Sequence, residues 1–380
     1  MTIIDRYLLQ KYVQTFVICF ATLMGLYVVL DLTTNLEEFR VSGEKVGGLL
    51  LFVIRFYSYK AIAFFDYTSG FLAMASAMFT IAWIQRHQEM TALMAAGVPR
   101  IRVLLPLICA VATVSVLSAI NRETLIPRHR RELARRPQDP LGDQPQVLVQ
   151  RCDGQTDVLL GGGHTYADHQ RIEEPDFRLP ASLRWPDCRR LSAENAYWKT
   201  AEGTRPAGYL LVGVREPKNL EGRSSLYQGK RQVLITPKDA PDWLHGDECF
   251  LASDVEFDQL TARNTFRQFS STAQLARALQ NPSLNFGADV RVAIHARAVQ
   301  PLLDVTLLML GLPLLFSRES RNVFIAIGMC IGVTALFMLV VQGCQYLGTS
   351  SWFLTPALAA WLPLMIFVPP AVGMADSLWK

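Results

Sequence analysis

The chain has 380 residues, of which 51% are hydrophobic and 18% charged, and its formal net charge is +4. So small a charge, without an RNA- or DNA-binding motif, argues against nucleic acid as a partner. Mean hydropathy is only +0.20, yet apolar runs dominate residues 1–121 and 298–380, whereas 122–297 is rich in Arg, Asp, Pro and Gly. A single water-soluble domain does not segregate its residues in this way. We therefore predict two membrane blocks that enclose one water-soluble domain.

Six segments have the length and apolar character of membrane spans, at about 20 residues per crossing. The first apolar run lacks the small-residue cleavage site of a signal peptide, so we expect it to remain as an anchor. Residues 322–375 contain no Asp, Glu, Lys or Arg and are too many for one crossing, so we divide them at the turn signal of residues 348–351. The predicted spans are 12–32, 61–84, 103–121, 298–316 and two within 322–375.

The connection between the second and third spans, about residues 85–99, is more elaborate than a simple hairpin requires. It starts with polar side chains, carries an acid at Glu89, and ends in Gly97-Val98-Pro99, where a helix would stop. We predict a short helix on the membrane surface that is presented to a partner; an ordinary hairpin is an equal alternative. Gly97 is then needed either for a positive φ or for close approach to a groove.

The short loops indicate the orientation of the chain. With the N-terminus inside, the inner side holds Arg6, Lys11, Arg86, Arg100, Arg102, Arg318, Arg321 and Lys380, and the outer side holds Arg40, Lys45, Arg55 and Lys60. This bias of eight cations against four favours cytoplasmic N- and C-termini and an outward-facing central domain.

Two acids fall within predicted spans, where a charge costs at least a few kcal/mol and is expected to face protein or a wet cavity. For Asp66 the alternatives are a polar lining or inter-helix contact and a position near the outer interface with the carboxylate extended toward water, and we favour the second. Asp304 is deeper in its span, and Arg297, one to two helical turns away, is its candidate partner.

The central domain has the pattern of short strands. Prolines and glycines interrupt it every 10 to 20 residues, and the loop at 202–206 reads as a hairpin connection. We predict an all-β sheet or sandwich, open at an edge, followed by a short amphipathic helix over 273–280 that Ser271 and Thr272 cap. The predicted strands are 146–150, 195–200, 208–214, 231–235 and 248–257.

No catalytic constellation or cofactor motif is found in the sequence. The run Gly161-Gly162-Gly163-His164 lacks the Walker lysine and reads as a turn, and His164 and His169 have no third ligand at metal-binding spacing. Hydrolysis of ATP by this chain is therefore not expected. Cys152, Cys188 and Cys249 lie in the central domain and leave open whether one disulfide forms among them.

Four segments resemble the lipopolysaccharide-export permease family of the LptF/LptG type. Residues 3–8, Ile-Ile-Asp-Arg-Tyr-Leu, are similar to the family's opening, and 88–98, Gln-Glu-Met-Thr-Ala-Leu-Met-Ala-Ala-Gly-Val, to its coupling-helix motif. The others are Arg-Ala-Val-Gln-Pro-Leu at 297–302, with Gly-Leu-Pro-Leu at 311–314, and Thr-Pro-Ala-Leu-Ala-Ala-Trp-Leu-Pro at 355–363. Each motif alone is weak, but together they cover both membrane blocks in the right order.

The resemblance implies an α+β membrane protein with six transmembrane helices and a jellyroll-like periplasmic β domain between the third and fourth. Its expected domains are 1–121 with a coupling helix at about 85–99, 122–297, and 298–380. The implied function is that of a permease subunit in the inner membrane, without a cofactor, that extracts lipopolysaccharide or a related glycolipid. Spans one and five would line lateral gates. The implied partners are a second permease subunit, a dimeric cytoplasmic ATPase and a periplasmic β-jellyroll bridge protein.

The resemblance also assigns candidate site residues. ATPase contact falls to Glu89, Thr91, Met94, Ala95 and Gly97. The outer cations Arg40, Lys45, Arg55 and Lys60 are candidates to hold lipid phosphates, although each singly is as well explained as an interfacial anchor. Acyl chains would follow inward-facing strand residues, which otherwise form an ordinary sandwich core: Val147, Val149, Tyr197, Leu210, Val212, Val233, Ile235, Val255 and Phe257.

Two other functions compete with this interpretation. A membrane-anchored sensor or scaffold would use the outer β domain to bind a ligand, but no output domain lies on the inner side. A secondary transporter would carry internal repeats and paired mid-membrane charges, neither of which we find. The sequence leaves open which of the two permease roles the chain has, whether it forms a homodimer or a heterodimer, and which lipid is exported.

Overall fold

The fold is that of a computed structural model of the whole chain. It describes residues 3–135, 137–139, 145–167, 169–183, 185, 188–203, 205–229, 231–240, 242–261, 263–281, 283, 287–316, 323–350 and 354–379. The chain divides into two compact units. The helical unit comprises residues 1–133, 270–272 and 287–380, and the β unit comprises 134–269 and 273–286.

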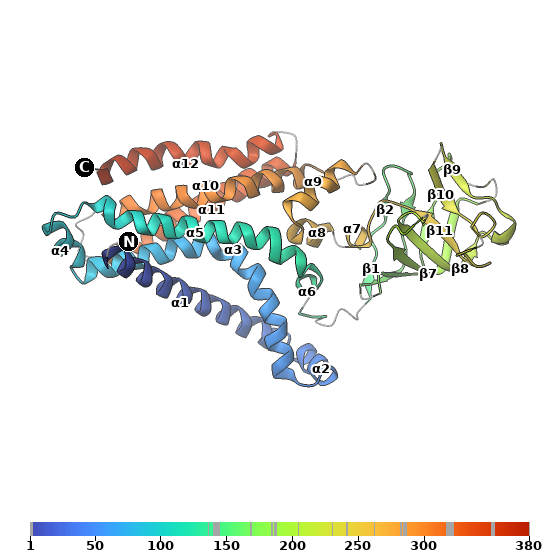
Figure 1. Ribbon diagram of the computed structural model, residues 1–380, viewed down its shortest axis with the longest axis horizontal. Coiled ribbons are helices and arrows are strands. Elements are labelled where there is room, and N and C mark those ends of the chain that lie inside the picture. Colours follow the sequence, from blue (N-terminus) through green and yellow to red (C-terminus); the bar gives the residue numbers. More distant parts are fainter. Residues whose placement is uncertain are drawn as a thin grey trace. The chain divides into compact units, whose positions relative to one another are not determined.

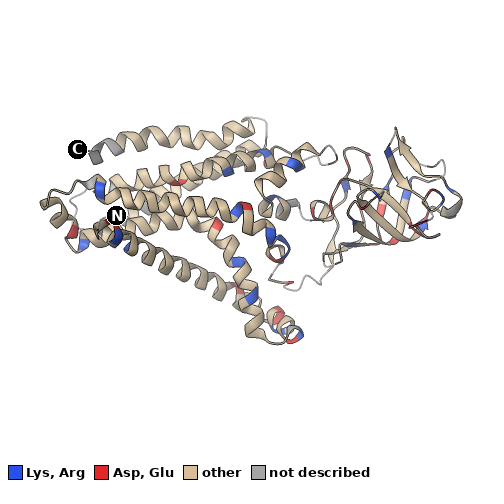
Figure 2. Ribbon diagram, in the orientation of Figure 1, with Lys and Arg blue, Asp and Glu red and all other residues tan. Residues whose placement is uncertain are grey.

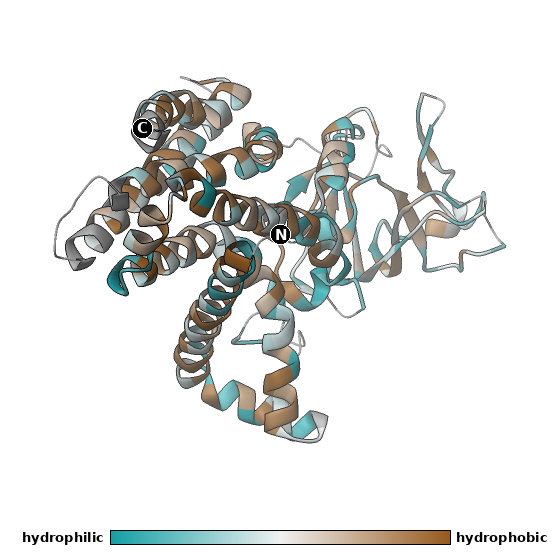
Figure 3. Cartoon of the chain, turned by 60° about the vertical axis from the view of Figure 1, so that its left-hand side comes forward, coloured by the Kyte–Doolittle hydropathy of each residue, from teal (hydrophilic) through white to brown (hydrophobic). Residues whose placement is uncertain are grey.

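Long helices build the helical unit (Figure 1). Hydrophobic residues run along them, and charged residues gather mainly toward their ends (Figures 2 and 3). The helices are α1 (Ile3–Thr34), α2 (Leu36–Val46), α3 (Leu49–Arg86), α4 (Glu89–Ala95), α5 (Arg100–Arg128), α10 (Ala288–Phe316), α11 (Val323–Thr349) and α12 (Pro356–Trp379), with α6 (Arg130–Ala134) at the boundary of the unit.

In the described part of the chain, five helices are long and apolar enough to cross a membrane: α1, α5, α10, α11 and α12. The predicted second span lies within α3, which counts as a sixth only together with α2, from which it is bent by 111°. Four helices extend well beyond the predicted spans: α1 begins at Ile3, α3 at Leu49 and α10 at Ala288, and α5 continues to Arg128. Hydropathy marks the apolar part of a helix, not its ends, so polar turns at either end escape such a prediction.

The core of the helical unit lies between α3, α5, α10, α11 and α12, whereas α1 packs on one side of it. Only Leu8 and Tyr12 of α1 are buried. Along α3, α1 forms aromatic contacts, with ring centroids 6.0 Å apart for Phe20 and Phe64 and 6.1 Å apart for Phe20 and Phe65. Most of the α1 surface is therefore apolar and uncovered within this chain.

The β unit is built on an antiparallel sheet, as the sequence predicted. Its path is β1-β4-β5-β7-β8-β11-β10-β9, and β6 joins β2 and β3 to β7. The strands in the described residues are β1 (Gln146–Val147), β2 (Arg151–Cys152), β3 (Leu159–Leu160), β4 (His164–Tyr166), β5 (Arg171–Glu173), β6 (Asp176–Arg178), β7 (Arg190–Lys199), β8 (Gly208–Glu216), β9 (Leu226–Gln228), β10 (Arg231–Ile235) and β11 (Cys249–Ala252).

Strand positions agree in part with the predictions. The predicted hairpin is present, because β7 and β8 pair antiparallel with Tyr197 opposite Leu210, and β10 has the predicted bounds. Two predicted strands are too long: β1 ends at Val147, and β11 ends at Ala252, so Phe257 instead begins helix α7 (Phe257–Thr261). The main chain turns near Asp254, whose carboxylate forms two hydrogen bonds with Arg231, each 2.9 Å long.

Short helices follow the sheet: α7, α8 (Arg263–Phe269) and α9 (Thr272–Gln280), besides the 3-10 turn η1 (Leu220–Gly222). The predicted helix over 273–280 is α9. At its start, the carboxylate of Glu123 in α5 accepts hydrogen bonds from the backbone N–H of Thr272, at 2.9 Å, and from its hydroxyl. The capping of α9 by Ser271 and Thr272 stays a prediction. Within the helical unit, α5 thus holds the start of α9.

Candidate functional site

The loop between α3 and α5 contains the predicted surface helix, α4. It ends in a Schellman motif, since the N–H of Val98 donates to the carbonyl of Leu93 and that of Gly97 donates to Met94, both at 3.0 Å. Gly97 has φ +79°, and a Cβ at this position would meet open space. The positive φ, one of the two predicted reasons for this glycine, is therefore present, and close approach to a partner's groove stays a prediction.

One face of α4 is held against the ends of three long helices. Met90 is buried with Leu8 of α1, Ile84 of α3 and Val103 of α5, and Leu93 packs beside them. This small apolar cluster fixes α4 to the helices on either side of it in the sequence and also to α1.

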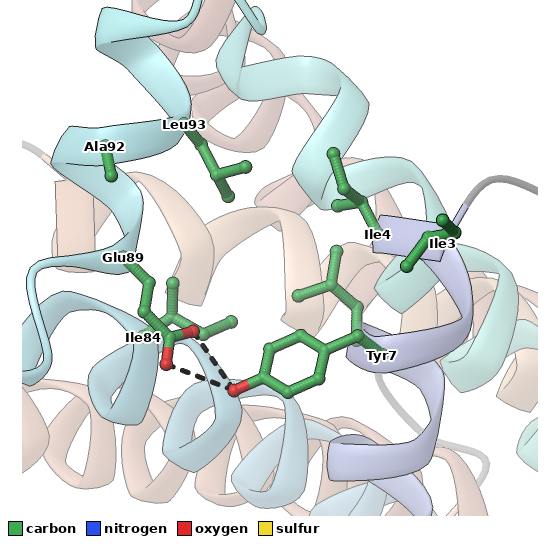
Figure 4. Close-up of a pocket in the computed structure, with 8 residues that line it drawn as sticks. Ile3, Ile4, Tyr7, Ile84, Glu89, Ala92 and Leu93 are labelled. Carbon is green, nitrogen blue, oxygen red and sulfur yellow. Dashed lines mark hydrogen bonds between the residues drawn. The ribbon is translucent and has the colours of Figure 1, made fainter.

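The acid of α4 interacts with the first turns of α1. The hydroxyl of Tyr7 lies 3.1 Å from each carboxylate oxygen of Glu89, within hydrogen-bonding distance of both. Figure 4 shows the two side chains pointing toward one another across a cavity of about 430 Å³. Its lining is otherwise aliphatic: Ile3, Ile4, Leu8, Ile84, Ala92 and Leu93. Tyr7 belongs to the Asp-Arg-Tyr motif noticed in the sequence, but it was not among the predicted site residues.

The other predicted coupling residues lie on the free face of α4 or directly after its end. Thr91, Met94, Ala95 and Gly97 are exposed, and Glu89 is half-buried by its contact with Tyr7. The helix therefore offers small and apolar side chains on one side and a carboxylate at its start, an arrangement suited to docking against another protein.

A polar layer joins α3, α5 and α10 inside the helical unit. Arg122 of α5 forms an ion pair with Asp66 of α3, with Nε 3.0 Å from Oδ1, and the Ser118 hydroxyl donates to the same oxygen at 3.0 Å. Both charged side chains are less than one-fifth exposed. Asp66 therefore does not extend toward water as predicted; it is neutralised by an arginine across the helix interface.

Asp304 of α10 lies deeper and is 5% exposed. Its carboxylate accepts hydrogen bonds from Ser115, at 2.8 Å, and from Gln300, at 3.0 Å. A Cβ at Gly70 would come within 2.5 Å of this carboxylate, so α3 approaches closely here. The predicted pairing with Arg297 is wrong: that guanidinium donates to the carbonyl of Ser270 at 2.7 Å. Seven residues separate the two along α10, about 10 Å of helix axis.

The four predicted phosphate ligands lie on α2 and the first half of α3. Arg40, Lys45 and Arg55 are exposed, and Arg40 forms an ion pair with Glu37 at 3.4 Å. Lys60 is half-buried, and its ammonium donates to the carbonyl of Leu133 at 2.9 Å and lies 5.3 Å from the ring centre of Phe56. The ammonium group of Lys60 therefore already has hydrogen-bond and aromatic contacts within the chain.

The nine candidate acyl-chain residues do not line one surface. Val147 and Val149 are 76% and 71% exposed, and Tyr197, Leu210 and Val212 are half-buried. The other four are buried: Val233, Ile235, Val255 and Phe257. The prediction of a single inward face is wrong. The buried side chains of β8 are Tyr209 and Leu211, which alternate with Leu210 and Val212, so these two candidates lie on the other face of the sheet.

Large aromatic side chains fill the interior of the β unit. Tyr209 is fully buried, with its ring centroid 5.8 Å from that of Phe177 and 4.9 Å from that of Trp198. Its hydroxyl donates to the carbonyl of Val255 at 3.0 Å. Burial raises the pKa of this phenol well above its ordinary value. Val233, Val255 and Phe257 belong to the same packed core.

The cysteines and histidines form no metal site in the residues that the structure describes. Cys152, Cys188 and Cys249 are free thiols, the first exposed and the other two buried. Burial raises the pKa of Cys249, so its thiol stays protonated. Within the described ranges, no group of three or more His, Cys, Asp and Glu side chains has the geometry of a metal site.

These features define a class: a polytopic membrane protein with a short external helix between two long ones and an antiparallel β unit inserted before the last three long helices. A family model described as "Lipopolysaccharide export system permease LptF/LptG" matches residues 6–151 and 244–375. The chain belongs to this family. A comparison with curated proteins finds no match.

Family membership establishes the coarse identity of the protein. It is a permease of the lipopolysaccharide export system, a transport component and not an enzyme, and it is a multi-pass protein of the inner membrane. The match includes α4 and the start of the β unit. It leaves out residues 152–243, which hold most of the strands.

Proposed function

We propose that this chain is one permease half of an ATP-driven exporter that extracts lipopolysaccharide, or a related glycolipid, from the outer leaflet of the inner membrane. A separate cytoplasmic ATPase supplies the energy. The observation that carries the proposal is the family match over both helical blocks, including α4 with its exposed face and Glu89.

The ATPase docks on α4. Three features of the helix support this. A Schellman motif ends it, and the buried Met90 packs it against the long helices. Its side chains Thr91, Met94 and Ala95 are exposed. A rigid, short helix with small side chains can enter a groove of a partner with little loss of conformational entropy. ATP-driven movement of the ATPase would then reach α1, α3 and α5 through the cluster around Met90.

A second permease subunit completes the transport path, and α1 and α11 line its lateral gates. The apolar surfaces of these two helices support this role, because many of their large side chains are left uncovered by the part of this chain that the structure describes. The exposed large side chains include Val17, Ile18, Leu26, Val29 and Leu30 on α1, and Ile331, Leu336, Leu339 and Tyr346 on α11. Contact with lipid or with another subunit removes such surface from water.

The β unit is a jellyroll-type periplasmic domain that passes the lipid to a β bridge protein. The sheet path ends at two short strands, β1 and β9. At the β1 end the apolar side chains of Val147 and Val149 are exposed. An open edge can extend by strand addition onto another sheet. In this arrangement α3, taken with α2, is the sixth span, and both termini are cytoplasmic.

The lipid contacts two regions in this proposal. Its phosphates meet Arg40, Lys45 and Arg55, with Lys60 nearby, on α2 and α3. Its acyl chains meet the half-buried Tyr197, Leu210 and Val212, while the buried members of the candidate set contribute only if the core opens. An exposed acyl chain costs ~0.8 kcal/mol per CH₂ in water, so a continuous apolar path is required.

Co-purification tests the proposal. The chain, expressed with its genomic neighbours and extracted in mild detergent, is expected to bring down an ATPase and a second permease subunit. Purification with neither partner, although the chain is folded, would favour a membrane-anchored sensor or scaffold.

A further inference from the structure

The cavity between the start of α1 and α4 is unusual because it is apolar at the polar end of a membrane helix. Asp5, Arg6, Gln10 and Lys11 all lie in the first eleven residues, so this part of α1 lies outside the hydrocarbon. Even so, Ile3 is 90% exposed beside the cavity. An aliphatic side chain left so open next to an apolar hollow marks an interaction surface.

The chemistry of the cavity restricts what can occupy it. Ile3, Ile4, Ala92 and Leu93 supply aliphatic walls, and the Glu89 carboxylate, hydrogen-bonded by Tyr7, supplies one negative group (Figure 4). An acyl chain would take this carboxylate out of water without offering it a partner, which is costly. A second copy of the chain would oppose a like charge across a two-fold contact. A protein surface with an aliphatic side chain beside a basic one satisfies both parts of the cavity.

We propose that the ATPase binds α1 as well as α4: it inserts an aliphatic side chain into the cavity between Ile3 and Leu93, and an adjacent lysine or arginine pairs with Glu89. The inference rests on the proposed function, since it extends the docking surface from α4 to the first turn of α1. Tyr7 acts as a positioning residue, because its hydroxyl holds the carboxylate at the mouth of the cavity.

The contact has a consequence for coupling. Elsewhere α1 is attached mainly by its packing on α3, and only Leu8 and Tyr12 are buried. A partner seated in the cavity touches α1 and α4 together. Movement of the ATPase would therefore reach α1 directly, in addition to the route through Met90.

The experiment measures ATPase affinity for the full permease assembly in detergent with Ile3→Asp, using Gln10→Asp as the control. Both residues are exposed on α1, and both substitutions add one negative charge, but only Ile3 lines the cavity. We expect Ile3→Asp to weaken ATPase binding at least tenfold and Gln10→Asp to leave it within twofold. Equal binding by both variants, or equal loss in both, would overturn the inference.

A photo-crosslinker at position 3 gives a second, independent reading. The expected product is an adduct with the mass of the permease plus the ATPase, absent when the crosslinker stands at position 10. Adducts with lipid or with a permease subunit alone would contradict the inference. If the unchanged chain binds no ATPase, the proposed function itself fails; if only the position 3 results are negative, that function stands and the α1 contact is wrong.

Discussion

Tyr7 and Glu89 are 82 residues apart in the sequence, yet the phenol hydroxyl lies 3.1 Å from both oxygens of the carboxylate. The contact links the first turns of α1 to the first residue of α4. Both residues fall in motifs that resemble the family's own, the opening motif and the coupling-helix motif. The structure thus brings the two motifs into contact through one carboxylate.

Tyr7→Phe removes the hydroxyl and keeps the ring. Since a hydrogen bond to a charged group contributes about 1.5–3 kcal/mol, we expect Glu89 to become mobile and ATP-driven transport to fall severalfold per ATP hydrolysed. The assembly should still form, because Met90 and its apolar neighbours are unchanged. Transport and hydrolysis measured together in proteoliposomes check this. An unchanged transport-to-hydrolysis ratio would mean that the hydrogen bond has no role in coupling.

Gly97→Ala is predicted to disturb the end of α4. The residue has φ +79°, and a left-handed conformation costs an L-residue about 1–2 kcal/mol. Weaker ATPase association in a pull-down is the expected result. Gly25→Ala is the matched control, since a Cβ there also meets open space but the residue lies within α1. Equal ATPase association by both variants would show that the positive φ of Gly97 is not needed for docking.

Arg122→Leu leaves the carboxylate of Asp66 without its cation at a site where both side chains are largely buried. Breaking one partner of a buried ion pair costs about 3–5 kcal/mol. We expect a clear fall in the Tm of the detergent-solubilised protein, and most of it should return in the double variant with Asp66→Asn. A double variant no more stable than Arg122→Leu alone would show that the ion pair is not the cause.

Cys152 offers a test of orientation without an introduced thiol in the β unit. It is the exposed member of the three cysteines there, whereas Cys188 and Cys249 are buried. In intact inner-membrane vesicles of right-side-out orientation, an impermeant maleimide should label Cys152 but not a cysteine introduced as Gln88→Cys. The opposite labelling pattern would invert the proposed topology.

The sequence predicted those parts of the fold that depend on local pattern. Apolar runs predicted most spans, and 231–235 was found as a strand because β-branched residues lie between turn residues. In contrast, α2 was missed because five of its eleven residues are charged, namely Glu37, Glu38, Arg40, Glu44 and Lys45. Strands such as β2 and β3 contain two residues each, too few for any alternation to be recognised.

Contacts between distant segments could not be predicted in this way. Asp304 was assigned to Arg297 because the two are close in sequence, but its partners are Gln300, one helical turn away, and Ser115, which is 189 residues away on another helix. The exposed face of α4 could be predicted from its residue types, whereas the Tyr7 contact could not. Side-chain partners depend on tertiary packing, and periodicity contains no information about it.

The most direct test of the account is ATP-driven release of lipopolysaccharide from proteoliposomes that contain the permease pair and its ATPase. We predict that the unchanged chain supports release, and that Glu89→Lys abolishes it while the chain still inserts and folds. Thr91→Ser, on the same helix and of similar size, should retain release. Normal release with Glu89→Lys, or no ATP-dependent release from the unchanged assembly, would contradict the assignment of α4 as the site through which ATP hydrolysis drives lipid export.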